Sequence, residues 1–122
     1  MRKMSREAMK QRTKQYALRI IRLVCSLPRT QVARHIGAQL LRAGTSVASN
    51  YRAACRGRSR AEFLSKLGTV EEEADESLFW QEVLIESGVV KARLLADLMR
   101  EGNEIVSIVF AARKTTRARG RA

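Results

Sequence analysis

Proline, histidine, cysteine and aromatic residues are all scarce in this sequence of 122 residues. Pro28 is the only proline and His35 the only histidine, and the aromatic residues are one Trp, two Tyr and three Phe. Few strong turn signals, together with many Ala, Leu, Arg and Glu residues, favour helix over sheet. A chain of this length forms one domain with a core of moderate size.

The two cysteines, Cys25 and Cys55, are too few for a disulfide framework and lack the spacing of metal ligands. In the helical layout described below they lie near opposite ends of a helix of about 25 residues. At about 1.5 Å per residue, that separation exceeds the reach of a disulfide. Free structural thiols are typical of a reducing cytoplasm, where we expect the protein to be located.

Long apolar segments are missing as well. The stretch at residues 16–27 is interrupted by Arg19 and Arg22, and no other run approaches the roughly 18 residues of a membrane span. The N-terminal residues do not have the pattern of a secretory signal. The sequence therefore predicts no membrane partner.

Motifs for catalysis and cofactor binding are also absent from the sequence. Residues 71–76 contain a carboxylate cluster, but a di-metal bundle site needs Glu-x-x-His pairs on two helices. His35 has no second ligand in sight, and neither a nucleophile–His–acid triad nor a Gly-rich phosphate loop can be assembled. We expect no metal, no cofactor and no enzymatic activity.

Two amphipathic helices are predicted in the first half of the chain from apolar residues at steps of three and four. The first covers residues 6–26 and ends before Pro28, because proline disfavours helix at the preceding residue. The second covers residues 31–55, with Thr30 as its cap. Small residues along the second helix let a neighbouring helix approach closely; they are Ala33, Gly37, Gly44 and Ala48.

Two further helices are predicted in the second half. Ser59, with Glu62 three residues later, is the capping-box pattern that opens the third helix, which ends at residues 87–88. The fourth helix covers residues 91–114, with a weak point at Gly102. Three short connections between four helices of similar length predict an all-α fold, an antiparallel up-down-up-down four-helix bundle.

The bundle is expected to cover residues 1–114, followed by a tail at residues 115–122. The tail holds no apolar residue larger than alanine and is rich in arginine. Segments of this composition bury too little apolar surface to offset the entropy of ordering. We therefore expect a disordered basic tail.

Positive charge is concentrated in the first half of the chain. Residues 1–60 hold 15 Lys or Arg and a single acid, Glu7, whereas residues 61–122 hold 9 basic and 11 acidic residues. In an up-down-up-down bundle, the start of the first helix, the turn at residues 56–58 and the end of the fourth helix lie at the same end. Much of the basic charge therefore gathers at one pole.

A basic pole with a basic tail is typical of proteins that bind nucleic acid. Arginine outnumbers lysine there, and its planar group suits phosphate, while few aromatic residues are available for base stacking. We expect RNA or DNA backbone binding with little sequence readout. The candidate nucleic-acid-binding residues are Arg2, Lys3, Arg6, Lys10, Arg52, Arg56, Arg58, Arg60, Arg113, Lys114, Arg117, Arg119 and Arg121. The alternative is that these charges only keep the protein soluble.

Arg42 on the second helix is expected to lie level with Glu72 and Glu73 on the third, since the two helices form a hairpin. The interpretation favoured by the sequence is a structural bridge, and the alternative is part of a functional site. Ser46 and Asn50 lie one and two turns further along and complete a structural polar network.

Two features leave room for self-association. The acidic residues at 71–76 form a stripe that suits a basic neighbour, including another copy of this chain. Trp80, with Phe79, is the main aromatic cluster. Core packing is its default role, and an interface between subunits is the alternative, because Trp is enriched among interface anchors.

Three segments carry a resemblance to a known family: QLLRAGTSVASNYRAA at residues 39–54, RSRAEF at 58–63 and EEADESLFW at 72–80. The chain resembles, over roughly residues 10–112, small bacterial four-helix-bundle proteins first noticed as open reading frames within intervening sequences of large-subunit ribosomal RNA genes. The same superfamily includes the accessory variability determinant of diversity-generating retroelements. The segments match the intervening-sequence branch better than the retroelement branch.

The resemblance implies a homopentamer with a basic surface that binds nucleic acid. In the retroelement branch it also implies a reverse transcriptase as partner and a role in the mutagenic copying of a template RNA. Together with the charge pattern, this favours a non-enzymatic, oligomeric nucleic-acid-binding adaptor. The alternative is a structural or protein-interaction scaffold of the intervening-sequence type with no nucleic-acid role.

Overall fold

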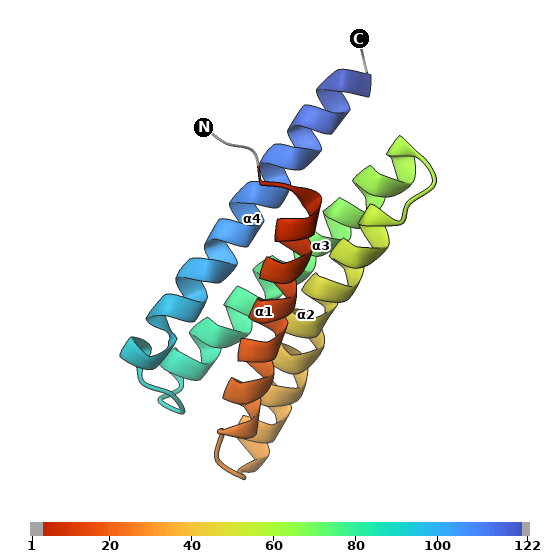
Figure 1. The fold of residues 1–122 in the computed structure, drawn as a ribbon. Helices are drawn as coiled ribbons and strands as arrows, with labels where there is room; N and C mark the ends of the chain where they lie inside the picture. Colours follow the sequence, from red (N-terminus) through yellow and green to blue (C-terminus); the bar gives the residue numbers. More distant parts are fainter. Residues whose placement is uncertain (1–3, 121–122) are drawn as a thin grey trace.

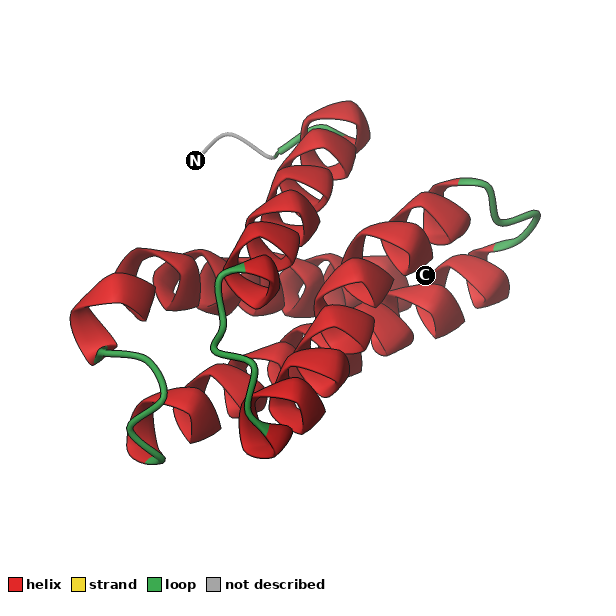
Figure 2. Cartoon of the chain, turned by 90° about the horizontal axis from the view of Figure 1, so that it is seen from below, coloured by secondary structure: helices red, strands yellow, loops and turns green. Residues whose placement is uncertain are grey.

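The structure is a computed structural model that describes residues 4–120 (Figure 1). Four helices follow one another, α1 (Arg6–Cys25), α2 (Gln31–Cys55), α3 (Arg60–Glu86) and α4 (Ala92–Gly120). Successive helices run in opposite directions, and only short turns connect them within the described range (Figure 2). The predicted all-α four-helix bundle is confirmed.

Local sequence signals set the helix starts. The hydroxyl of Ser5 accepts a hydrogen bond from the Ala8 N–H at 3.0 Å, and Thr30 and Ser59 cap α2 and α3 in the same way. The carboxylate of Glu62 in turn accepts from the Arg58 N–H at 2.6 Å, one residue before the cap. The α2–α3 turn is thus fixed by its own side chains.

The core is formed by one apolar face from each helix. Each helix packs against its neighbours in the chain, and α1 also meets α4. The largest fully buried apolar side chains are Tyr16, Ile20, Leu40, Leu67, Leu84, Leu95 and Ile105. A Cβ at Gly44 would lie 2.8 Å from two carbons of Ile20, so the small residue on α2 allows the close approach of α1.

A polar cluster lies at the centre of the apolar core. The hydroxyl oxygens of Tyr16 and Ser77 are 2.7 Å apart, and Gln81 donates from Nε2 to the Tyr16 hydroxyl at 3.0 Å. All three residues are fully buried. Burial raises the pKa of the Tyr16 phenol, which therefore stays neutral.

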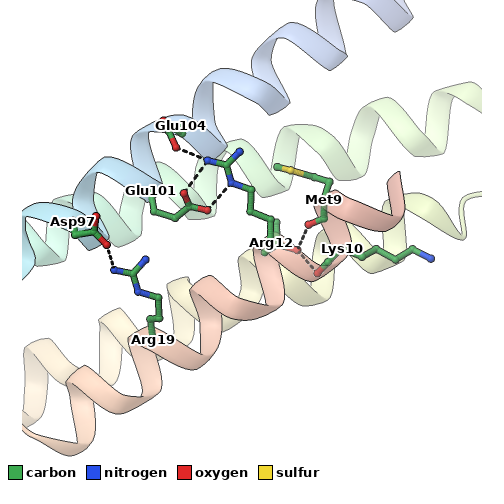
Figure 3. Close-up of polar contacts among 8 residues, drawn as sticks. Met9, Lys10, Arg12, Arg19, Asp97, Glu101 and Glu104 are labelled. Carbon is green, nitrogen blue, oxygen red and sulfur yellow. Dashed lines mark hydrogen bonds and ion pairs between the residues drawn. The ribbon is translucent and has the colours of Figure 1, made fainter. Parts of the chain in front are cut away.

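Arginines bridge α1 and α4, the neighbouring pair with the least direct packing (Figure 3). Arg12 donates to Glu101 through Nε at 2.6 Å and Nη2 at 2.8 Å, and also pairs with Glu104. Arg19 pairs with Asp97 at 2.6 Å. This seam is therefore held largely by long charged side chains.

The last helix is longer than expected from the sequence. α4 continues without interruption from Ala92 to Gly120, so residues 115–120 are helical rather than disordered. Thr115, Thr116 and Gly120 are poor helix formers, but the end of the helix lies against α3, where a Cβ at Gly120 would be 3.3 Å from Arg60 Cδ. Gly102 does not break the helix either. It is buried, and a Cβ there would lie 2.8 Å from both the Tyr16 hydroxyl oxygen and Leu78 Cδ2.

Candidate nucleic-acid interface

The start of α1, the α2–α3 turn and the end of α4 lie at the same end of the bundle, as the topology predicted (Figure 1). We call this end the basic pole. Its described cationic residues are Arg6, Lys10, Lys14, Arg52, Arg56, Arg58, Arg60, Lys114, Arg117 and Arg119. Three other candidates, Arg2, Lys3 and Arg121, lie outside the described residues.

One side of the basic pole is hollowed between α1, the α2–α3 turn and α4. This turn hollow has a volume of about 360 Å³. Its lining contains four arginines and no acidic residue; the polar and charged members are Arg6, Arg58, Ser59, Arg60, Thr116 and Arg119. Segments far apart in the chain thus direct positive charge at one space.

Neighbouring groups support two of these arginines. The guanidinium carbon of Arg6 lies 4.3 Å from the ring centroid of Phe63, a cation–π contact. The side chain of Arg60 lies against Gly120, where a Cβ would be 3.3 Å from Arg60 Cδ. Both arginines are therefore braced by a second helix.

A second hollow, between α1 and α2, lies at the same pole. It has a volume of about 430 Å³, and its charged lining residues are Glu7, Lys10, Lys14, Arg52 and Arg56. Glu7 partly offsets the positive charge, since its carboxylate lies 3.4 Å from the Lys10 ammonium. This α1/α2 hollow is therefore less strongly cationic than the turn hollow.

Tyr51 lies beneath the pole and is almost fully buried. Burial, reinforced by the neighbouring Cys55 thiol, raises the pKa of the Tyr51 phenol. The phenol therefore stays neutral and adds no negative charge to the pole.

Several acidic residues of α3 and α4 pair with arginines that are not among the pole cations. Arg12, Arg19, Arg42 and Arg100 each pair with a carboxylate. Among the cations of the basic pole, only Lys10 forms an ion pair with a described residue. The other cations of the pole have no carboxylate partner among the described residues.

Arg113 differs from the other candidate residues. Its Nη1 donates to Glu71 at 2.8 Å, its side chain is 27% exposed, and it lies beside Gly68 on α3. The α3–α4 packing therefore occupies Arg113, and we do not include it in the basic pole.

The expected bridge from Arg42 to α3 is present with a different second partner. Arg42 donates to Glu73 at 2.8 Å and also pairs with Glu76, whereas Glu72 is exposed and has no ion pair with a described residue. Residues 73 and 76 are neighbours on one helix face, and residue 72 points elsewhere. The bridge is half-exposed, which fits the structural interpretation.

Ser46 and Asn50 do not join that bridge. The Asn50 side-chain amide donates to the Ser46 backbone carbonyl at 2.9 Å, within α2. The residues of the expected polar network therefore form two separate contacts, the Arg42 bridge to α3 and the Asn50–Ser46 hydrogen bond within α2. The buried cluster of Tyr16, Ser77 and Gln81 was not predicted from the sequence. Polar residues at core-facing positions of the two amphipathic helices would have indicated it.

Two further features are absent from residues 4–120. No group of three His, Cys, Asp or Glu side chains is arranged to hold a metal ion there. Within the same residues, none of the helices combines the length and apolar character needed to span a membrane. Both cysteines are free thiols.

The family described as 23S rRNA-intervening sequence protein matches residues 6–111. This chain belongs to that family. The match covers all of α1 to α3 and most of α4, and it includes the α2–α3 turn of the basic pole.

A solved structure has the same fold. It is a crystal structure at 1.70 Å resolution of a protein of unknown function from the S23 ribosomal protein family of Bacteroides thetaiotaomicron VPI-5482. The sequences are 30% identical, the TM-score is 0.85, and the similarity covers 91% of this chain and 99% of that one. No curated protein matches this chain. This chain thus shares its four-helix fold with a protein of unknown function from the S23 ribosomal protein family.

Proposed function

We propose that this intervening-sequence protein is a non-enzymatic nucleic-acid-binding adaptor whose basic pole binds the phosphate backbone of RNA or DNA. The main support for this proposal is that the basic pole holds many cations, of which only Lys10 is paired with a described carboxylate. Cations from three segments converge there, while arginines elsewhere engage most of the acids of α3 and α4. Such a field attracts polyanions and releases their counterions on binding.

The chemistry of the pole favours backbone binding over base reading. Arginine predominates, and its fork donates two hydrogen bonds to a phosphate. The one aromatic ring in its hollows, Phe63, is covered by Arg6 and offers little surface for base stacking. Sequence-independent affinity with a steep salt dependence is the expected result.

The test is fluorescence anisotropy with labelled RNA and DNA oligonucleotides at several salt concentrations. Binding by about six or more phosphate contacts weakens by about 10³-fold or more between about 50 and 200 mM salt. Reversing Arg56, Arg58 and Arg60 to Glu should weaken binding without changing helicity. A matched control reverses Arg29, Arg34 and Arg100, which are exposed and lie outside the pole.

If the pole variant and the control variant bind the oligonucleotides with equal affinity, the α2–α3 turn is not part of the binding site. Micromolar binding that does not weaken with salt would contradict backbone binding by the pole. Absence of any binding at low salt would favour the scaffold alternative.

Self-association is the second part of the proposal, and a surface stripe on α3 supports it. Phe79 is 50% exposed, although it is a large aromatic residue. Exposed acids flank it at the same face of the helix, at Glu72, Asp75, Glu82 and Glu86. We call these five residues the acidic stripe.

A groove between the end of α1 and the start of α4 complements this stripe. It has a volume of about 730 Å³ and an apolar floor that includes Leu23, Leu27 and Leu98. Its rim holds four cations and no acid; the cations are Arg19, Arg22, Lys91 and Arg93. Arg19 is already paired with Asp97, which leaves three cations for a partner.

We infer that the acidic stripe of one copy docks into this distal groove of the next. The two surfaces differ, so the contact is head-to-tail and closes into a ring where the rotation permits. A ring would place several basic poles on one nucleic acid and raise the affinity by multivalency. The resemblance to the retroelement accessory protein favours a pentamer.

Native mass spectrometry and a charge swap test this arrangement. Glu82→Arg with Glu86→Arg should dissociate the oligomer, and so should Arg22→Glu with Arg93→Glu. A variant that carries all four substitutions has the charge pair reversed in every copy and should restore assembly. A monomeric wild-type protein at tens of micromolar would contradict the docking mode.

The adaptor role also calls for a protein partner. In the retroelement branch of the superfamily that partner is a reverse transcriptase, which stays a prediction for this chain. A gene for a reverse transcriptase beside this one, and co-purification of the two proteins, would support it. A position inside a ribosomal RNA gene would favour the scaffold alternative.

A further inference from the structure

The turn hollow differs from the rest of the basic pole in its composition. Four arginines line about 360 Å³, together with Ser59 and Thr116, and no Asp or Glu is among the lining residues. The α1/α2 hollow, by contrast, combines two lysines with two arginines and Glu7. The two hollows therefore suit anions of different charge.

Four arginines around one hollow repel one another. Like charges close together repel, and the repulsion is stronger beside a protein surface than in bulk water. An anion of higher charge relieves more of this repulsion than an anion of single charge. The turn hollow thus favours a phosphate that carries more than one charge.

Nucleic acids contain two kinds of phosphate. An internal phosphodiester carries one charge and has two unesterified oxygens. A terminal phosphomonoester carries a charge of about −1.5 to −2 at pH 7 and has three strong acceptor oxygens. It therefore offers more oxygens for the bidentate geometry of arginine.

The arginines of the hollow are partly preorganised for such a ligand. Arg6 is held on the ring of Phe63, and the stem of Arg60 lies against the backbone at Gly120. Immobilising a flexible side chain costs conformational entropy on binding. These contacts already restrict Arg6 and Arg60, so less entropy is lost when the ligand binds. The hydrogen bond from the Arg58 N–H to Glu62 also fixes the turn.

We propose that the turn hollow binds the terminal phosphate of a nucleic-acid strand, a phosphomonoester, in preference to an internal phosphodiester. The inference rests on the proposed function, because the α1/α2 hollow and the rest of the pole bind the adjoining backbone. Strand ends are then held at the α2–α3 turn, with α1 and α4 on either side.

The experiment compares RNA oligonucleotides of one sequence that carry a 5′-phosphate, a 3′-phosphate or hydroxyls at both ends. At about 150 mM salt, one phosphorylated form should bind about tenfold more tightly than the hydroxyl form, which is the gain from about one charged hydrogen bond. Millimolar inorganic phosphate should remove this advantage without abolishing backbone binding.

Matched double variants locate the effect. The double variant Arg58→Ala with Arg119→Ala should bind the phosphorylated oligonucleotide and the hydroxyl form with about equal affinity. Arg52→Ala with Arg56→Ala, in the α1/α2 hollow, should weaken the binding of both oligonucleotides and leave the ratio of their affinities unchanged. Circular dichroism confirms that each variant remains helical.

Titration of the ligand provides an independent readout. The second pKa of a phosphomonoester is about 6, so its charge falls between about pH 7.5 and pH 5.5, whereas arginine stays protonated. The preference for the phosphorylated end should decrease over that interval.

The possible results distinguish binding of a terminal phosphate by the turn hollow from binding of the nucleic-acid backbone by the whole pole. Equal, salt-dependent binding of all three oligonucleotides overturns the inference and leaves backbone binding intact. A preference that survives the Arg58 and Arg119 substitutions overturns the assignment to the turn hollow. Failure of all three to bind overturns both.

Discussion

The hydroxyl groups of Tyr16 and Ser77 lie 2.7 Å apart in the centre of the bundle, and they join α1 to α3. These two helices are diagonal in the bundle, and their backbones do not approach each other closely. Gln81 completes the contact by donating to the same tyrosine oxygen at 3.0 Å. A polar link in an apolar interior is satisfied only in the correct register, so it favours a single arrangement of the helices.

Replacing Tyr16 with Phe should destabilise the protein by about 1–3 kcal/mol, because the Ser77 and Gln81 groups lose a buried partner. Urea unfolding measures the change. The Ser77→Ala variant provides the control. If the hydroxyls form one unit, the double variant should lose less than the sum of the two single losses. Additive losses would mean that the groups act independently.

Replacing Gly102 with Ala should destabilise the bundle by about 1–3 kcal/mol. The new methyl group would lie 2.8 Å from the Tyr16 hydroxyl oxygen and from Leu78 Cδ2, and a packed core does not accommodate it without a shift.

Gly68 is the matched control for Gly102, since it also lies within a helix. A Cβ there would be 3.5 Å from the nearest atom, the Nη2 of Arg113, which is an ordinary contact. Gly68→Ala should therefore stabilise the protein by about 0.5–1 kcal/mol through helix propensity. If both substitutions shift the melting temperature in the same direction, Gly102 does not lie as close to Tyr16 and Leu78 as described.

Replacing Arg12 with Ala should destabilise the protein by about 1–2 kcal/mol, because Glu101 would lose two charged hydrogen bonds in a half-buried position. Arg100→Ala is the control, since the side chain of Arg100 is 67% exposed and its pairing with Asp97 should contribute almost nothing. Unfolding measured at low and high salt should show a smaller difference between these variants at high salt. Equal stability of the two variants would show that the α1–α4 seam does not depend on Arg12.

Trp80, the only tryptophan, reports on the ionisation of Glu76. Its indole Nε1 donates to the Glu76 carboxylate at 3.1 Å. This hydrogen bond, with help from Arg42, lowers the pKa of Glu76 below its ordinary value of 4.5. The folded pKa is below the unfolded one, so the stabilising effect of Glu76 is present above about pH 4.5 and is lost as pH falls through the folded pKa.

The fluorescence of Trp80 should therefore change with a midpoint below pH 4.5, and Glu76→Gln should abolish that transition. Arg42→Ala should move the midpoint upward. Glu82→Gln, which changes an exposed acid further along α3, serves as the control. A transition that is identical in the wild type and in Glu76→Gln would exclude the proposed contact.

Local signals predicted most of the fold. The caps Thr30 and Ser59, and the proline after α1, fixed helix boundaries because they act on adjacent backbone groups. The position of the basic pole followed from topology alone, since an even number of antiparallel helices returns the chain to the end where it started.

Features that depend on three-dimensional packing were harder to predict. The choice of Glu76 rather than Glu72 as a partner of Arg42 depends on the rotation of α3 about its axis. The pairing of Arg113 with Glu71 depends on the α3–α4 register. The extension of α4 to Gly120 places its last turn against Arg60 of α3, a tertiary contact that composition alone does not indicate.

The geometry of the chain ends has a practical consequence for how the protein is handled. The start of α1 and the end of α4 lie at the same end of the bundle as the α2–α3 turn (Figure 1), so an affinity tag or fluorophore fused to either chain end would emerge at the cationic end. The turn around Gly88, whose φ of 80° marks a tight reversal, lies at the far end of the bundle. A label inserted there leaves the charged end open to solvent, but it would lie beside Val89 and Lys91 of the distal groove and would interfere with the proposed docking of a second copy.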